Sequence, residues 1–160
     1  MNKKLLVCTF SGGRTSAFMG LMLKEHPSYK DFDKVFIFAN TGKELPETLD
    51  FINECDKRWG LDVVWLEAKV VHEKGVGTNY KIVDYESASR KGEPFTDMLN
   101  KYPLPNNMAS NCTRELKMRP IEKYIDFDIF RNRLSGVVIF MFIIINIIFL
   151  NHFYMLNWAV

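Results

Sequence analysis

The chain has 160 residues, and its 21 Lys and Arg outnumber its 19 Asp and Glu by two, which makes the formal net charge +2 at pH 7. A chain of this length is sufficient for one domain with a hydrophobic core. The near-neutral balance argues against a dedicated polyanion binder, whose domains concentrate basic residues, and we find no direct sign of nucleic-acid binding.

Apolar runs alternate with amphipathic segments over the first part of the chain. Short apolar runs bounded by polar residues predict strands over residues 5–10, 34–39 and 62–66. Apolar residues at helical spacing predict helices over residues 15–25 and 46–59, the second with Pro46 in its first turn and Gly60 as its stop. This order predicts an α/β fold in which right-handed crossovers build a parallel sheet.

The regular pattern fades after Glu67. Residues 80–85 suit one further strand, and residues 94–101 and 114–125 suit two helices, the second begun or interrupted by Pro120. We therefore assign residues 1–126 to one domain and residues 127–160 to an apolar tail.

The cysteines indicate a reducing compartment. Cys8, Cys55 and Cys112 match no zinc, Cys-x-x-Cys or disulfide-framework spacing, and the three histidines show no ligand spacing either, so we expect no metal site. The apolar run near the N-terminus, about six residues, is too short for a signal peptide. These features predict a cytoplasmic protein.

The loop after the first predicted strand is a candidate phosphate-binding site. It lies where open parallel sheets bind ligands, and its adjacent glycines allow close approach of the backbone. Free amides at the start of the helix, side-chain hydroxyls and one guanidinium suit phosphate oxygens. The alternative is a tight strand-to-helix turn without a ligand. The residues concerned are Ser11, Gly12, Gly13, Arg14, Thr15 and Ser16.

Four segments resemble known families. The order Ser11-Gly12-Gly13-x-x-Ser16 resembles the pyrophosphate-binding loop (PP-loop) of the adenine nucleotide alpha-hydrolase superfamily, usually Ser-Gly-Gly-x-Asp-Ser, with Thr15 in place of the Asp. Residues 38–48 are similar to the Asp-Thr-Gly…Pro-Glu-Thr stretch of the phosphoadenosine phosphosulfate (PAPS) reductase family, and residues 112–120 to its Cys…Lys…Pro element. Residues 83–95 resemble its phage and bacterial members.

This resemblance implies a Rossmann-like sheet with helices on both faces and a nucleotide-binding domain over residues 1–126. The loop residues would hold phosphate or sulfate oxygens of an adenine nucleotide, namely PAPS, adenosine phosphosulfate (APS) or ATP, as substrate or ligand, with no tightly bound cofactor. Asn40, Thr41 and Gly42 would line the same crevice near the adenosine. Their alternative is an ordinary strand-ending turn.

Cys112, Lys117 and Arg119 form a second candidate group. The resemblance favours Lys117 and Arg119 as anion ligands, and a thiol near cations becomes a nucleophile. The alternative is a buried cysteine beside a solvated basic face. No cysteine follows Cys112, and Asn111 replaces the partner of the cysteine pair that some relatives use for an iron–sulfur cluster.

Three functions follow from these observations. The family reaction is thiol-dependent reduction of a sulfonucleotide to sulfite, in which a C-terminal Glu-Cys-Gly type cysteine attacks and a thioredoxin-type reductant resolves the product. A second candidate is an ATP pyrophosphatase that adenylates a substrate. The third is a non-catalytic nucleotide-binding or membrane-attached protein, which the missing C-terminal cysteine favours.

The tail differs in composition from the rest of the chain. All 40 charged residues (21 + 19) precede residue 134, and residues 134–160 have none. We rank three interpretations: truncated or out-of-frame sequence that replaces the catalytic end, then a membrane anchor that holds the domain on the cytoplasmic side, then a buried strand.

Overall fold

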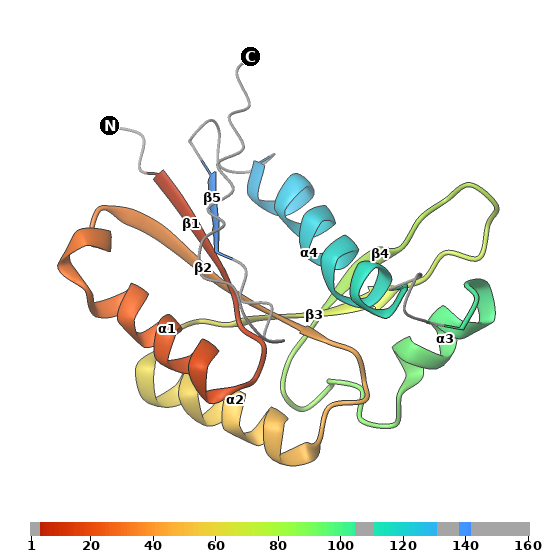
Figure 1. Ribbon diagram of the computed structural model, residues 1–160, viewed down its shortest axis with the longest axis horizontal. Coiled ribbons are helices and arrows are strands. Elements are labelled where there is room, and N and C mark those ends of the chain that lie inside the picture. Colours follow the sequence, from red (N-terminus) through yellow and green to blue (C-terminus); the bar gives the residue numbers. More distant parts are fainter. Residues whose placement is uncertain (1–3, 105–110, 131–137, 142–160) are drawn as a thin grey trace.

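The computed structural model describes residues 4–104, 111–130 and 138–141 (Figure 1). Its strands are β1 (Lys4–Thr9), β2 (Phe32–Asn40), β3 (Val64–Lys69), β4 (Asn79–Val83) and β5 (Val138–Met141). Its α-helices are α1 (Arg14–Glu25), α2 (Pro46–Trp59), α3 (Glu93–Lys101) and α4 (Arg119–Tyr124). A 3-10 turn, η1 (Pro27–Tyr29), follows α1, and two π-helical segments, η2 (Cys112–Met118) and η3 (Ile125–Phe130), flank α4.

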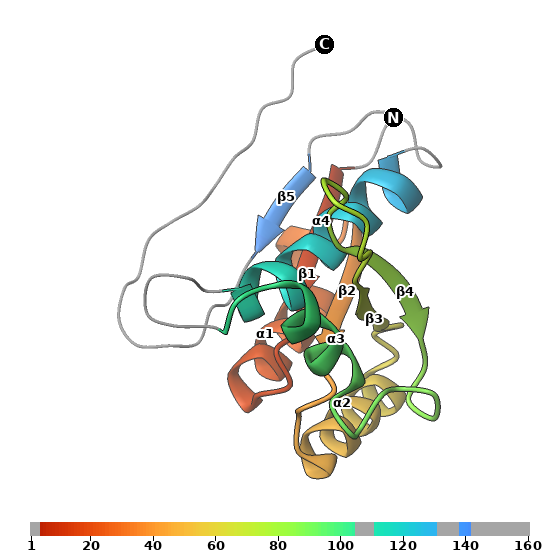
Figure 2. The same cartoon turned by 90° about the vertical axis from the view of Figure 1, so that its right-hand side faces the viewer.

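The strands form one sheet in the order β4-β3-β2-β1-β5 (Figure 2). β1, β2, β3 and β5 run parallel, whereas β4 is antiparallel to β3. The chain moves from β1 to β2 and β3 on one side, and β5 pairs on the other side of β1. The strand order therefore reverses at β1, and in open α/β sheets ligands bind at the carboxyl ends of the strands at such a point.

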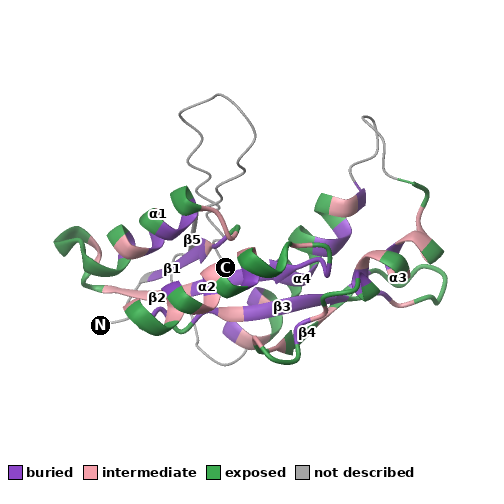
Figure 3. Cartoon of the chain, turned by 90° about the horizontal axis from the view of Figure 1, so that it is seen from below, coloured by how far each residue is buried: buried purple, intermediate pink, exposed green. Residues whose placement is uncertain are grey.

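α1 and α2 cover one face of the sheet (Figure 1). Alternate strand residues point into this face because successive side chains of a strand face opposite ways. The rings of Phe38 and Trp65 meet edge to face there, with centroids 5.0 Å apart. Figure 3 shows β1 and β3 mostly buried and the outer sides of both helices exposed. The buried residues of this layer include Leu6, Cys8, Phe36, Phe38, Leu49, Ile52, Cys55 and Trp65.

The helical run of residues 112–130 covers the opposite face. Ile121, Ile125 and Ile129 recur every four residues along it and pack on the alternate strand residues Leu5, Val7, Ile37, Ala39 and Leu66. The sheet is thus buried on both faces, which explains why its central strands read as nearly continuous apolar runs.

The structure confirms the predicted α/β fold and shifts several element ends. α2 has the predicted bounds, while β3 continues to Lys69, beyond the predicted end at Leu66. The helix predicted over residues 114–125 was too short, because the helical run covers residues 112–130. The Arg119 amide donates to the Arg114 carbonyl, and this wider turn accommodates Pro120, which has no N–H to donate.

Of the uncharged residues 134–160, the structure describes four. Val138–Met141 form β5 at the edge of the sheet, parallel to β1. The out-of-frame and membrane-anchor interpretations concern residues that lie mostly outside the described ranges. Within the described ranges no helix is both long and apolar enough to cross a bilayer.

Because both faces of the sheet are covered, truncating a buried strand residue should cost far more stability than truncating its exposed partner on the next strand. Leu66 is fully buried, whereas Ile82, its partner in the β3–β4 pair, is 58% exposed. Leu66→Ala should lower the free energy of unfolding by about 2–5 kcal/mol, because it removes buried methyl groups and leaves a cavity. Ile82→Ala should cost less than about 1 kcal/mol. Urea denaturation followed by circular dichroism measures both, and equal losses would contradict this description of the core.

Candidate functional site

Three segments with predicted site residues meet at the carboxyl edge of the sheet. The loop after β1 lies against β2, since the Phe10 amide donates to the Ile37 carbonyl at 2.7 Å. β2 continues three residues further, to Asn40. η2 packs against β2 and β3 from the other face. The topology thus brings together segments that are about a hundred residues apart in the sequence.

Ser16 organises the loop after β1. Its side chain is fully buried, and its hydroxyl donates to the Gly13 carbonyl at 2.8 Å. The same oxygen accepts from the Ser11 amide at 3.2 Å and from the Ser11 hydroxyl at 3.0 Å. Ser16 therefore fixes the shape of the loop from inside. Ser11, Arg14 and Thr15 are exposed to solvent.

Gly12 and Gly13 have different roles in this loop. Gly12 has φ of +81°, and a Cβ there would lie 2.6 Å from Cγ2 of Thr48 in α2. Gly13 is extended, with φ −93° and ψ 160°, and no described side chain caps the start of α1 after it. The first turn of α1 also lacks acidic residues. Its amides and its positive dipole end are therefore available to an anion.

A polar row crosses three strands below this edge. Asn40 of β2 pairs in register with Glu67 of β3, which pairs with Lys81 of β4. Asn40 Nδ2 donates to Glu67 Oε1 at 2.7 Å, and Lys81 Nζ lies 2.7 Å from Glu67 Oε2. The Ser89 amide and hydroxyl complete the set, at 2.6 and 2.9 Å. Asn40 and Glu67 are fully buried.

Four hydrogen bonds keep the Glu67 carboxylate ionised. Burial opposes ionisation, but the bonds from Lys81, Ser89 and Asn40 outweigh it and hold the pKa of this carboxyl below its usual value. The sequence interpretation missed Glu67 because it ended the strand one residue earlier. A carboxylate next to the apolar run Val-Val-Trp-Leu was the available signal.

Asn40, Thr41 and Gly42 reach the expected edge but are buried beneath the segment that leads to α3. Asn40 Nδ2 also donates to the Ser89 carbonyl at 2.9 Å, and its Oδ1 accepts from the Gly42 amide at 3.1 Å. A Cβ on Gly42, whose φ is +75°, would lie 2.9 Å from Cδ of Pro94. These three residues form a buried wall at the carboxyl edge of the sheet, and their polar groups make hydrogen bonds to other groups of the protein.

The three residues of the second candidate group, Cys112, Lys117 and Arg119, do not lie together. Lys117 Nζ lies 3.7 Å from Glu44 in the loop after β2, so it belongs to the carboxyl edge. Arg119 instead approaches Glu122 on its own helix, at 3.7 Å, and both side chains are about half exposed. Cys112 is half-buried against the cluster of Ala68, Val70, Met98 and Leu116 beside α3. The structure thus brings Lys117, and not Cys112, to the end of β2.

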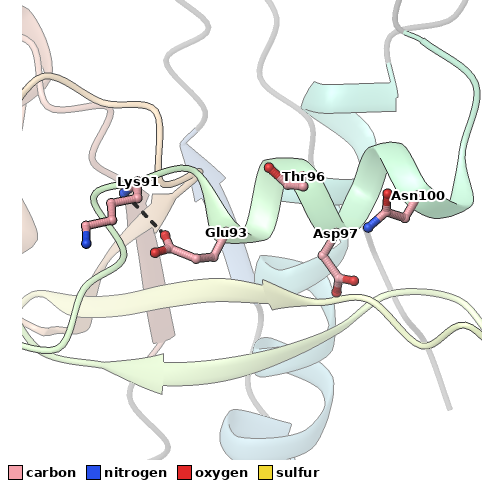
Figure 4. Close-up of a pocket in the computed structure, with 5 residues that line it drawn as sticks. All are labelled: Lys91, Glu93, Thr96, Asp97 and Asn100. Carbon is pink, nitrogen blue, oxygen red and sulfur yellow. Dashed lines mark hydrogen bonds between the residues drawn. The ribbon is translucent and has the colours of Figure 1, made fainter.

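A shallow depression runs along α3, lined by Lys91, Glu93, Thr96, Asp97 and Asn100 (Figure 4). Figure 4 shows the Lys91 amide bonded to Glu93, at 3.2 Å. Asp97 pairs with His72 at 2.6 Å. None of the predicted site residues lines this depression.

The described residues include no group of three or more His, Cys, Asp or Glu arranged to hold a metal ion. An iron–sulfur cluster of the kind that the resemblance raises does not fit here. Asn111 stands beside Cys112, and its side chain bonds to the Pro103 carbonyl and to Arg114.

Comparison with known families agrees with this geometry. The model of the phosphoadenosine phosphosulfate reductase domain matches residues 5–128. The chain belongs to this family. The match covers β1 to η3, and so includes the loop after β1, the end of β2 and the helical run with Lys117. Membership links the chain to sulfonucleotides at the level of the family.

The curated relatives are uncharacterised. The "Uncharacterized nin region protein ORF290" of Escherichia phage lambda is 35% identical over 123 residues, which are 75% of this chain and 42% of the phage protein. An uncharacterised protein of Methanocaldococcus jannaschii is 27% identical over 124 residues, 78% of this chain and 20% of its own length. The chain thus spans less than half of these relatives. No solved structure matches it significantly.

The row at Glu67 predicts a pH-dependent stability. A carboxyl whose pKa is lowered by folding stabilises the fold fully above its usual value of 4.5 and loses this contribution as the pH falls through the lowered value. Glu67→Gln should lower the free energy of unfolding at pH 7 by about 1–3 kcal/mol, because an NH2 group, which donates, replaces one carboxylate oxygen that accepts hydrogen bonds. The same change should also make the free energy of unfolding fall less steeply as the pH is lowered.

Urea titrations from pH 3 to pH 7 measure both effects, at pH values chosen to bracket the usual carboxyl range. The exposed Glu86→Gln provides the matched control and should leave the profile unchanged. A Glu67→Gln profile parallel to that of the unmodified protein would contradict the role given to the row.

The cysteines should differ in reactivity. Burial raises the pKa of the Cys8 thiol to about 12 and also raises the pKa of the Cys55 thiol, whereas Cys112 is half-buried. A thiol reagent should label Cys112 first in the native protein and all three cysteines in denaturant. Cys112→Ser should remove the native reaction. Fast native labelling of Cys8 or Cys55 would contradict this order.

Proposed function

We propose that the chain binds an adenine nucleotide of the sulfonucleotide type, with the phosphates at the loop of residues 11–16. The observation that supports this most directly is the shape of that loop. Ser16 holds it from within, and the uncapped start of α1 faces outward at the strand where the sheet order reverses. Membership of the PAPS reductase family makes a sulfonucleotide the first choice of ligand.

In this proposal the backbone supplies most of the phosphate contacts. The amides of the first turn of α1 donate to phosphate oxygens, the exposed Thr15 hydroxyl adds a bond, and the Arg14 guanidinium supplies charge. The Ser11 hydroxyl adds a further bond when it turns its proton from Ser16 to the ligand. Lys117 meets a further anionic group at the end of β2, and the buried wall of Asn40, Thr41 and Gly42 bounds the adenosine side. Arg119, paired on its own helix, contributes at longer range.

The chemical step is a separate proposal. Reduction of a sulfonucleotide needs a thiolate nucleophile and a thioredoxin-type reductant, and Cys112 is the candidate nucleophile among the three cysteines, because Cys8 and Cys55 are buried with raised pKa values. Its packing beside α3 favours nucleotide binding over reduction as the function of this chain. ATP pyrophosphatase chemistry is the second candidate, since the loop suits ATP as well.

A change at Gly13 tests the loop directly. The extended backbone at this position accepts any residue, so Gly13→Val places a branched side chain in the loop without backbone strain. Nucleotide binding should be lost, because the side chain blocks approach to the amides of α1, while the melting temperature should change little. Titration calorimetry with PAPS, APS and ATP measures the affinities.

Gly77→Val is the matched control. A Cβ at Gly77 meets no atom within 4 Å, and this residue lies in the segment before β4, away from the loop. Its affinities should equal those of the unmodified protein. Unchanged affinity in Gly13→Val would refute the assignment of the loop, and release of pyrophosphate from ATP would favour the pyrophosphatase over the reductase.

A further inference from the structure

Glu44 connects two segments at the carboxyl edge of the sheet. It lies between β2 and α2, and its Oε1 accepts a hydrogen bond from the Thr41 hydroxyl at 3.1 Å. The same oxygen lies 3.7 Å from Lys117 Nζ, which comes from η2 on the other face of the sheet. Thr41 is buried and fixes the carboxylate from below. Glu44 therefore places a negative charge beside the cation expected to meet a ligand.

The pair between Glu44 and Lys117 is loose. Its separation exceeds a direct hydrogen bond, and the side chains are 23% and 45% exposed. Ion pairs of this kind contribute little to stability, so exchange of the partner is inexpensive. A phosphate or sulfate group makes shorter, charge-assisted bonds to an ammonium group. An anion that reaches the end of β2 can thus replace Glu44 as the partner of Lys117.

We propose that Glu44 is a positioning residue: it holds Lys117 over the end of β2 in the free protein and gives it up to an anionic group of the bound nucleotide. This inference rests on the proposed nucleotide binding. It adds that the Lys117 ammonium group at the same site is held by Glu44 until the nucleotide binds. The pair lowers affinity for the anion, because its attraction must be lost before Lys117 binds. In return it keeps the ammonium group at the edge, where the anion arrives.

The test is a double-mutant cycle on nucleotide affinity. Glu44→Gln keeps an oxygen that accepts from Thr41 and removes only the charge. It should tighten binding of PAPS, APS or ATP, whichever binds the unmodified protein, by about two- to fivefold. Lys117→Met should weaken binding about tenfold. In the Lys117→Met background, Glu44→Gln should have no further effect, because its action passes through the ammonium group.

Glu47→Gln is the matched control for charge. Glu47 is exposed in the first turn of α2, three residues after Glu44, and its change should alter affinity less than twofold. The inference would be overturned if Glu44→Gln still tightened nucleotide binding in the Lys117→Met background, or if it changed the affinity only as much as Glu47→Gln does. Either result would leave simple repulsion between the carboxylate and the anionic nucleotide as the explanation. Failure of all three nucleotides to bind the unmodified protein would overturn the proposed function and this inference with it.

Discussion

The carboxyl edge of the sheet depends on one buried carboxylate. Glu67 stands in the middle of a row across β2, β3 and β4, where the side chains of Asn40 and Lys81 and two groups of Ser89 donate to it. Such a group is costly to bury unless every acceptor site is used, and here the bonds come from three separate segments. The carboxylate therefore joins the end of β2, β4 and the segment before α3 at one point.

The sequence predicted the architecture well because its signals are local. Pro46 and Gly60 mark the ends of α2, and apolar runs mark the buried strands. The polar row was missed because it depends on register: Asn40 and Glu67 meet only when the strands are paired. Residues 11–16 were predicted as a ligand loop, but the inward role of Ser16 follows from its burial. Pro120 reads in the sequence as a helix start or break, but the helical run of residues 112–130 passes through it because the preceding π-helical turn accommodates it.

The residues proposed to bind the nucleotide and the cysteines that could react with it lie in different surroundings. The loop after β1, the end of β2 and Lys117 converge at one edge, each fixed by contacts within the fold. Cys112 instead lies with apolar side chains of α3 and β3, and the other two cysteines are buried in the core layer under α1 and α2. The arrangement is therefore better suited to holding an anion than to attacking one.

The position of β1 also has a consequence for how the protein folds during synthesis. β1 pairs with β2 on one side, but its other neighbour is β5, and Leu5 finds its partner in Val138 near the far end of the chain. Pairings this distant in sequence form late, because a long loop must close first. The strand that leads into the loop after β1 therefore emerges with one open edge and keeps it until β5 has left the ribosome. An open apolar edge is prone to wrong pairing, so the loop of residues 11–16 depends on almost the last described residues for the completion of the strand that precedes it.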